Sequence, residues 1–404
     1  MNTQLSNDTS KHPSKHPSKQ LKIVIAPDSF KESLSAMEIA NEIEAGFREI
    51  FPDALYVKVP VADGGEGTVQ AMIDASGGRL VTLPVRGPLG VPVDAFYGIM
   101  GDGATAVIEM AAASGLELVP PDRRDPLRTT SYGTGELIRN ALDAGARRFV
   151  LGIGGSATND GGAGMLQALG GRLLDAAGND LAPGGGPLAE LGRIDLSGLD
   201  ARIKDCVFDV ACDVSNPLVG PQGASHIFGP QKGATPAMVA TLDANLGHYA
   251  AVIARELGRD VADIADLPGA GAGGGIGAAM LVFLGGSLRP GSEIVTDAVG
   301  LDAAVADADL VLTGEGRIDS QTIHGKTPIG VARVAARHGK PVIGIAGSLE
   351  PGAGVVHGHG INAVFSVVNC PCSLERALAD AAYNVRTSAR NIAAVLRLGT
   401  QLGL

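Results

Sequence analysis

Short apolar runs at both ends of the chain follow a spacing that strongly limits the possible folds. Near the N-terminus the run 21–26 precedes an amphipathic helical pattern that stops at Pro52, and the run 56–61 precedes a second helical pattern over 67–75. The last third of the chain repeats this alternation, with runs at 310–313, 342–346 and 363–367. Because strands that alternate with helices form parallel sheets, both ends predict a doubly wound, Rossmann-like arrangement.

The middle of the chain has a different pattern. Between 79 and 112, short strand patterns alternate with turn signals such as Gly87-Pro88-Leu89-Gly90, which is typical of hairpins. We therefore predict an α/β protein of two domains: a discontinuous Rossmann-like parallel-sheet domain, 21–80 plus 285–404, and an inserted mixed α/β domain, 81–284. The polar segment 1–20, with its repeated Lys-His-Pro-Ser unit, predicts a disordered tail.

Composition excludes several classes of function. A formal net charge of −11 argues against binding of nucleic acid. No apolar run approaches the length of about 18 residues that a membrane span needs, and the N-terminus lacks the apolar region of a secretory signal. We expect a cytoplasmic protein that acts on a small molecule. The sequence carries no signal for an oligomeric state.

Polar loops follow the predicted strands of both chain ends. In an open parallel sheet ligands bind outside the carboxyl ends of the strands, so these loops are expected to lie together. They mix carboxylates and hydroxyls with lysine and arginine, which suits Mg²⁺, a substrate carboxylate and a moving phosphoryl group. One such loop is more often a helix cap, whereas four on one edge favour a site. The residues concerned are Asp28, Ser29, Lys31, Asp63, Glu66, Glu315, Arg317, Asp319 and Lys326.

The inserted segment contributes a glycine-rich run, 154–164, directly after a predicted strand. Successive backbone N–H groups at the start of a helix form a cradle for phosphates. The predicted nucleotide-binding residues are Gly154, Gly155, Ser156, Asn159, Asp160, Gly161 and Gly162. Two more polar residues belong to loops of this segment. Lys232 is expected to contact an anionic substrate, and Asp213 is either a helix cap or a metal-binding carboxylate.

A dinucleotide fingerprint is the main competing interpretation. The residues 152–157 fit G-x-G-x-x-A, and Asp175 stands where an acid for a ribose would be, so an NAD(P)-dependent oxidoreductase acting on a small hydroxy acid is the alternative. Two features weaken it, because the glycines continue beyond the fingerprint and Asn159-Asp160 interrupts the expected helix start. A P-loop is absent, since Ser320 stands where its first glycine should be.

Six long motifs resemble those of the type 1 glycerate kinase family, in order and from Lys22 to the C-terminus. They are IAPDSFKESLSA (25–36), VPVADGGEGT (59–68), GIGGSATNDGGAG (152–164), CDVSNPL (212–218), FGPQKGA (228–234) and TGEGRIDSQTIHGKTPIGVA (313–332). The resemblance implies ATP-dependent phosphorylation of D-glycerate to 2-phosphoglycerate, in glyoxylate and sugar-acid catabolism. It also implies a Rossmann-like half and a distinct second domain.

A mechanism of direct in-line transfer follows as a hypothesis. Mg²⁺ and ATP are the expected cofactors, with the phosphates on the glycine-rich cradle and Asp213 as a metal ligand. Asp63 or Asp319 would orient or deprotonate the attacking hydroxyl group. Lys31, Arg317 and Lys326 would supply positive charge. The other predicted substrate-binding residues are Asp28, Ser29, Glu66, Glu315 and Lys232.

Overall fold

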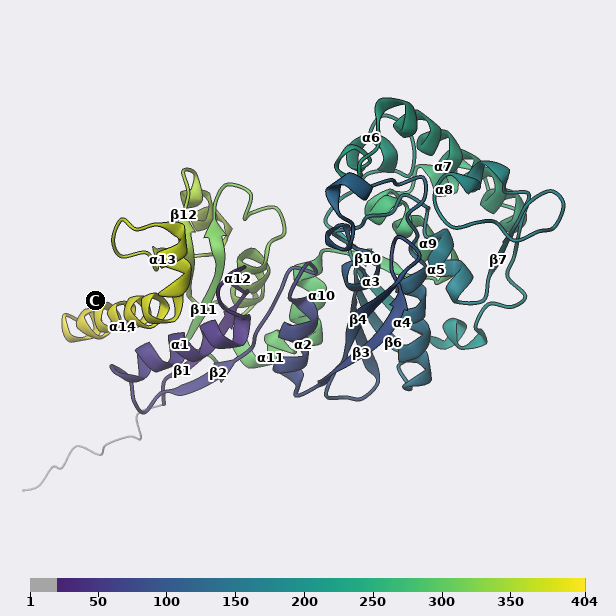
Figure 1. The fold of residues 1–404 in the computed structure, drawn as a ribbon. Helices are drawn as coiled ribbons and strands as arrows, with labels where there is room; N and C mark the ends of the chain where they lie inside the picture. Colours follow the sequence, from purple (N-terminus) through teal and green to yellow (C-terminus); the bar gives the residue numbers. More distant parts are fainter. Residues whose placement is uncertain (1–19, 404) are drawn as a thin grey trace, which may run out of the picture.

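The computed structural model describes residues 20–403 and shows two lobes joined at a waist (Figure 1). The predicted tail, residues 1–20, lies almost wholly outside the described residues. Of the helices between residues 20 and 403, none is both long enough and apolar enough to cross a lipid bilayer.

The smaller lobe is built on a five-stranded parallel sheet that both ends of the chain share. Its strand order is β13-β12-β11-β1-β2. The strands are β1 (Lys22–Pro27), β2 (Leu55–Lys58), β11 (Leu310–Ile318), β12 (Val342–Leu349) and β13 (Ala363–Ser366). Because β1 from the N-terminus pairs with β11 from the last third, the predicted Rossmann-like sheet is confirmed.

Helices cover both faces of this sheet. The helices of this lobe and of the waist are α1 (Ala36–Arg48), α2 (Thr68–Ser76), α10 (Gly291–Ala298), α11 (Leu301–Val305), α12 (Thr327–Arg337), α13 (Leu374–Ala379) and α14 (Ala381–Gln401). Alternate residues of β1 face opposite sides, so Ile23 and Ile25 pack with α1 and α14, whereas Val24 packs on the α12 side. Ser35 starts α1 with a capping box that includes Glu38.

The larger lobe contains a six-stranded mixed sheet of order β10-β9-β6-β5-β4-β3. Its strands are β3 (Arg79–Arg86), β4 (Pro92–Ile99), β5 (Thr105–Glu109), β6 (Arg148–Gly152), β9 (Val207–Ala211) and β10 (Ser287–Arg289). The predicted hairpins are confirmed, since β3, β4 and β5 pair antiparallel. The remaining pairs are parallel. A separate antiparallel pair joins β7 (Arg172–Leu174) and β8 (Arg193–Asp195).

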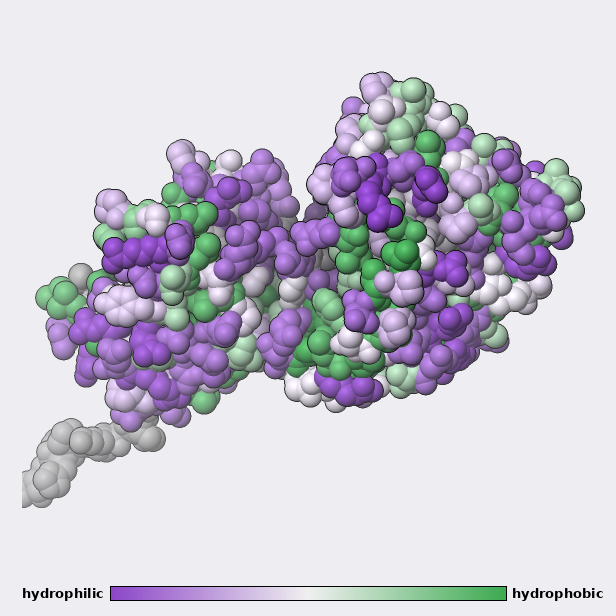
Figure 2. All heavy atoms as spheres, in the orientation of Figure 1, coloured by the Kyte–Doolittle hydropathy of each residue, from purple (hydrophilic) through white to green (hydrophobic). Residues whose placement is uncertain are grey.

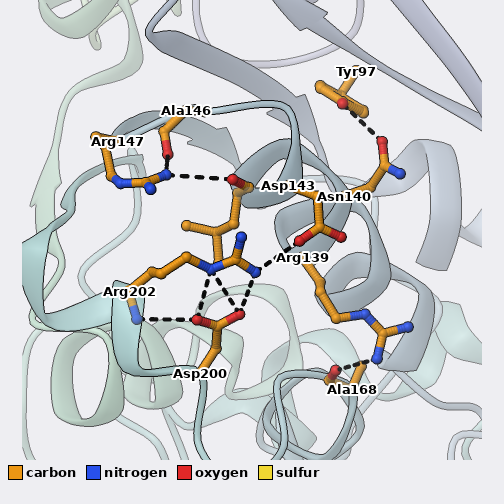
Figure 3. Close-up of polar contacts among 10 residues, drawn as sticks. Tyr97, Arg139, Asn140, Asp143, Ala146, Arg147, Ala168, Asp200 and Arg202 are labelled. Atoms are coloured by element: carbon orange, nitrogen blue, oxygen red, sulfur yellow. Dashed lines mark hydrogen bonds and ion pairs between the residues drawn. The ribbon is translucent and has the colours of Figure 1, made fainter.

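The helices of the larger lobe are α3 (Ala111–Ser114), α4 (Tyr132–Asp143), α5 (Ala163–Ala168), α6 (Ala224–Phe228), α7 (Pro236–Leu257), α8 (Ala262–Ala265) and α9 (Ile276–Phe283). Polar contacts fix α4 to its surroundings (Figure 3). The guanidinium of Arg202 lies 2.8 Å from Asp143 and 2.6 Å from Asp200, and the Tyr97 hydroxyl donates to Asn140 at 2.8 Å. These contacts join α4 to β4 and to the segment before β9.

The chain passes between the lobes twice, and both passages lie in the waist. One leads from β2 through α2 to β3, and the other leads from β10 through α10 to β11. The helices α2 and α10 contact each other there (Figure 1). One apolar cluster runs through the waist, because it contains Val24 of the first sheet together with Val107 and Val150 of the second. The predicted domain limits stay a prediction, and β10 belongs to the six-stranded sheet.

Candidate active site

The site is built where polar segments leave the first sheet and meet the second. Strand β1 ends at Pro27, which pairs with Gly314 of β11, so Asp28 and Glu315 follow on neighbouring strands. The segment after β2 runs along the same edge and brings Asp63 to the larger lobe. Its approach is very close, because a Cβ added to Gly152 would lie 2.1 Å from the carbonyl oxygen of Gly64. A glycine at this strand end therefore allows the two lobes to touch.

Asp28 is held by donors from two distant parts of the chain. Its Oδ1 accepts a hydrogen bond from the Ser29 amide at 2.7 Å, and its Oδ2 accepts one from the Thr327 hydroxyl at 2.5 Å. Desolvation of the carboxyl group raises the pKa of Asp28 to about 7; the negative charge of Asp63 adds to this shift, and the Thr327 bond opposes it.

Glu315 is a second carboxylate with a raised proton affinity. It is 7% exposed and accepts a hydrogen bond from the Thr322 hydroxyl at 2.6 Å. Desolvation raises the pKa of Glu315 to about 7, against the opposing effects of Thr322 and of the Lys326 ammonium. That ammonium lies 3.8 Å from Glu315 and 3.9 Å from Asp319. Lys326 thus balances part of the negative charge that these loops bring together.

Arg317 and Asp319 form an ion pair at the edge of this group. The Arg317 Nε lies 3.2 Å from Asp319 Oδ2, and the Arg317 side chain is 62% exposed. The glycines of the segment 314–318 predict a loop after the strand 310–313, and that prediction is wrong. Strand β11 continues through it, with Arg317 opposite Ser348 and Ile318 opposite Leu349 of β12.

A cavity of about 360 Å³ lies between the two lobes and brings seven of the predicted residues together. In the space-filling view a hollow separates the lobes on the side to which β11 and β12 point in Figure 1 (Figure 2). From the smaller lobe and its loops the wall includes Lys31 and Asp63. From the larger lobe it includes Gly154, Gly155, Ser156, Asp213 and Lys232. Ser29 and Glu66, again with Lys31, line a neighbouring cavity of about 260 Å³.

Lys232 is the most deeply enclosed charged group in this wall. It is 2% exposed, and its ammonium donates to the Ser156 hydroxyl at 2.7 Å and to the Thr158 carbonyl at 2.6 Å. Burial lowers the pKa of Lys232 to about 7, and the charge of Asp160 opposes that shift only in part. Lys232 therefore ties the turn 154–158 to the loop 229–233.

The glycine-rich run divides into a part at the cavity and a part inside the lobe. The residues 154–156 line the cavity, whereas Asn159 and Asp160 are fully buried. The Asp160 carboxylate accepts hydrogen bonds from the Ser131 amide and hydroxyl and from the amides of Gly162 and Gly164, at 2.8 to 3.3 Å. Desolvation raises the pKa of Asp160, while these donors oppose the shift. Asp160 thus fixes the start of α5. The nucleotide-binding role predicted for 159–162 stays a prediction.

Asp213 and Asp63 are the carboxylates of the cavity wall. Asp213 accepts a hydrogen bond from the Gly291 amide at 3.3 Å, and Gly325 of the smaller lobe lies beside it. Partial loss of hydration raises the pKa of Asp213, and the charge of Asp63 adds to the effect. Among residues 20–403, no three His, Cys, Asp or Glu side chains form a metal cluster. A pair of carboxylates still suits Mg²⁺, which usually takes one or two of them together with phosphate and water oxygens.

Some residues of the site have no signal in the sequence that predicts their role. Thr327 and Thr322 act on Asp28 and Glu315 from a segment in which only the charged residues were singled out. Ala272 and Gly273, from the glycine-rich run 269–274, also line the cavity. The signal in that case was the glycine run itself.

The dinucleotide alternative is not favoured. Helix α5 begins at Ala163, six residues after the fingerprint 152–157 ends, so the fingerprint does not open a helix. Asp175 uses its carboxylate within its own turn, where it accepts hydrogen bonds from the amides of Ala177 and Asn179 at 2.8 Å.

Comparison with known proteins identifies the family. Residues 23–397 match the model of the glycerate kinase family. The chain is 64% identical to glycerate 2-kinase of Escherichia coli (strain K12) over 94% of its length and 99% of that protein. It is 58% identical to glycerate kinase of Bacillus subtilis (strain 168), covering 95% and 100% of the two chains. The crystal structure of putative glycerate kinase 2 from Salmonella typhimurium LT2 superposes with a TM-score of 0.88 at 63% identity, covering 95% and 100%. The chain therefore belongs to the glycerate kinase family, and its enzymatic activity is that of a glycerate kinase.

Proposed function

We propose that the enzyme transfers the γ-phosphoryl group of ATP to the 2-hydroxyl group of D-glycerate in the cavity between the lobes. The products would be ADP and 2-phosphoglycerate, in glyoxylate and sugar-acid catabolism. The observation that carries this proposal is the composition of the cavity wall. Lys31 and Asp63 come from one lobe, and Gly154–Ser156, Asp213 and Lys232 come from the other. A site of this kind can position two anionic substrates and release them when the lobes separate.

The transfer is a single displacement. The 2-hydroxyl oxygen of glycerate forms a bond to the γ-phosphorus while the bond from that phosphorus to the bridging oxygen breaks, and ADP leaves with the electron pair. The hydroxyl proton passes to a carboxylate. We assign this role to Asp63, because it lies in the cavity wall, whereas Asp319 is held in an ion pair with Arg317. A positioned base typically contributes about 10²–10⁴-fold to the rate.

The remaining polar residues bind and orient the substrates. Gly154–Ser156 would receive the phosphates through backbone N–H groups. Lys31 and Lys326 would neutralise the glycerate carboxylate and the moving phosphoryl group, with Arg317 at the exposed rim. Asp28 and Glu315 would accept hydrogen bonds from substrate hydroxyl groups. Ser29 and Glu66 belong to the adjoining cavity and would contact the same substrate from there.

Asp213 would hold Mg²⁺ together with phosphate and water oxygens. The raised pKa of Asp213 fits this role, since a desolvated carboxyl group near the Asp63 carboxylate gains stability when a cation binds to it. Bound Mg²⁺ supplies charge neutralisation for the phosphate oxygens. A cytoplasmic location and the domain limits given above complete the proposal.

The decisive experiment is an ADP-release assay with D-glycerate, followed by phosphorus NMR of the product. A signal of 2-phosphoglycerate is expected. A signal of 3-phosphoglycerate would overturn the assigned hydroxyl group, and ADP release that does not depend on glycerate would overturn the transfer itself. A fluorescence titration with NADH tests the disfavoured oxidoreductase activity in the same preparation.

Two variants test the assignment of residues. Asp63→Asn should lower kcat by at least about 100-fold with little effect on the KM for ATP, because the proton acceptor is lost. Lys326→Ala should raise the KM for glycerate and lower kcat, because Glu315 and Asp319 lose the cation between them. Near-normal turnover of both variants would mean that these loops do not form the active site.

A further inference from the structure

A second large cavity lies in the larger lobe, apart from the one described above. Its volume is about 880 Å³, and its wall includes Arg123, Arg124 and Arg128. Cavities of about 300–1,000 Å³ hold small-molecule ligands. None of the residues proposed above for catalysis or substrate binding lines this cavity.

The three arginines of this wall outnumber its two carboxylates. Within residues 20–403, none of their guanidinium groups forms an ion pair. Two aspartates share the wall, Asp122 and Asp125, and the second of them accepts a hydrogen bond from the Leu127 amide at 3.0 Å. In a chain of net charge −11, an excess of guanidinium groups over carboxylates in one cavity wall favours the binding of an anion there.

The cavity is also connected to the active site through one short loop. Arg124 donates from Nη1 to the Gln231 carbonyl at 3.4 Å and from Nε to the Val119 carbonyl at 3.4 Å. Gly233 lines the arginine cavity, whereas its neighbours Gln231 and Lys232 line the active-site cavity. An anion that draws the Arg124 guanidinium away from Gln231 would therefore change the loop that carries Lys232.

We propose that the Arg123–Arg124–Arg128 cavity binds a small molecule with two or more phosphate or carboxylate groups, and that its occupancy changes the turnover of the enzyme. Arginine suits this ligand class, because its planar guanidinium group binds phosphate and carboxylate oxygens in pairs. The cavity is large enough for such a molecule, and the loop 229–233 transmits its effect to the active site.

Inorganic pyrophosphate serves as the probe, measured by isothermal titration calorimetry on the full-length protein without Mg²⁺. The double variant Arg123→Ala/Arg128→Ala should bind pyrophosphate at this site about 100-fold more weakly, since each charge-assisted contact contributes about tenfold. The matched control is Arg193→Ala, an exposed arginine in β8 that lines neither cavity. An unchanged affinity in the double variant would overturn the site.

The effect of the bound anion on turnover needs a second measurement. With free Mg²⁺ held constant, pyrophosphate should change the glycerate-dependent kcat of the wild type but not that of the double variant. Without pyrophosphate, both variants should keep the wild-type kcat and KM, which also shows that they are folded. Pyrophosphate that binds the wild type through these arginines without changing kcat would overturn the coupling. The calorimetric result does not depend on the proposed reaction, so failure of one proposal is distinguishable from failure of the other.

Discussion

Replacement of Lys232 by methionine tests the energetics of the active-site wall. The pKa of this lysine falls from 10.5 to about 7 on folding, because burial removes the water around its ammonium group. The folded state therefore binds the proton less strongly than the unfolded state. Below pH 7 the full cost of burying the charge is present, and it is relieved as the pH rises from 7 to 10.5. The shift corresponds to about 5 kcal/mol in total, at about 1.4 kcal/mol for each pH unit.

The pH dependence is the quantity to measure, because methionine cannot carry the proton. Loss of the two hydrogen bonds to Ser156 and Thr158 lowers stability by an amount that changes little with pH. The difference between wild type and Lys232→Met should therefore grow in favour of the wild type between pH 7.5 and 9.5. For a lobe of this size the melting-temperature difference should change by about 3–5 °C per pH unit.

Differential scanning calorimetry at closely spaced pH values measures this difference directly. The control is Lys204→Met, an exposed lysine of the same lobe whose ammonium stays in water in both states. Its difference from wild type should not change with pH. A Lys232→Met difference that stays constant from pH 7.5 to 9.5 would show that the ammonium is not desolvated, and the reasoning would fail.

Three further predictions concern the close packing at Gly274, the pKa of Asp28 and the contact between Glu109 and α2. Gly274→Ala should lower the melting temperature by several degrees more than Gly285→Ala. Both glycines have positive φ, but only the first would bring a Cβ to 1.9 Å from a carbonyl oxygen; equal losses in calorimetry would contradict this. Thr327→Val should move the acidic limb of the kcat/KM profile to higher pH by about one unit, because Asp28 loses a donor that lowers its pKa; an unmoved limb would count against it. Glu109→Ala should destabilise the protein by about 1–2 kcal/mol in urea unfolding, since the Val69 amide in the first turn of α2 loses its acceptor, and no loss would refute this.

Local patterns in the sequence predicted the elements but not every boundary. Helix α7, Pro236–Leu257, has boundaries that local signals mark: the cap at Thr235, Pro236 at the first position and Gly258 at the end. Strand β11 was predicted too short, because its glycines were taken as a turn. In the sheet they allow close strand packing, since a Cβ on Gly314 would lie 1.9 Å from the Ile345 carbonyl.

The sequence predicts which residues lie at the ends of the strands, but not which distant side chains they contact. Loops after parallel strands share one edge, and the structure brings Lys31, Asp63, Asp213 and Lys232 to one cavity. The partner of Asp28 is Thr327, which is 299 residues away in the chain, and no local pattern indicates that contact. The role of Asp160 could not be predicted from the sequence either. A buried carboxylate that fixes a helix start and an exposed one in a phosphate loop have the same sequence pattern.

The double passage of the chain through the waist has a mechanical consequence. Two covalent connections run side by side through α2 and α10, so each lobe is attached at two neighbouring points. A body attached at two points can turn about the line that joins them, but it resists twisting about the long axis of the molecule. Lobe motion during turnover should therefore be a hinge rotation about the line that joins α2 and α10. A single backbone cut within either passage would leave the lobes covalently joined but free to twist.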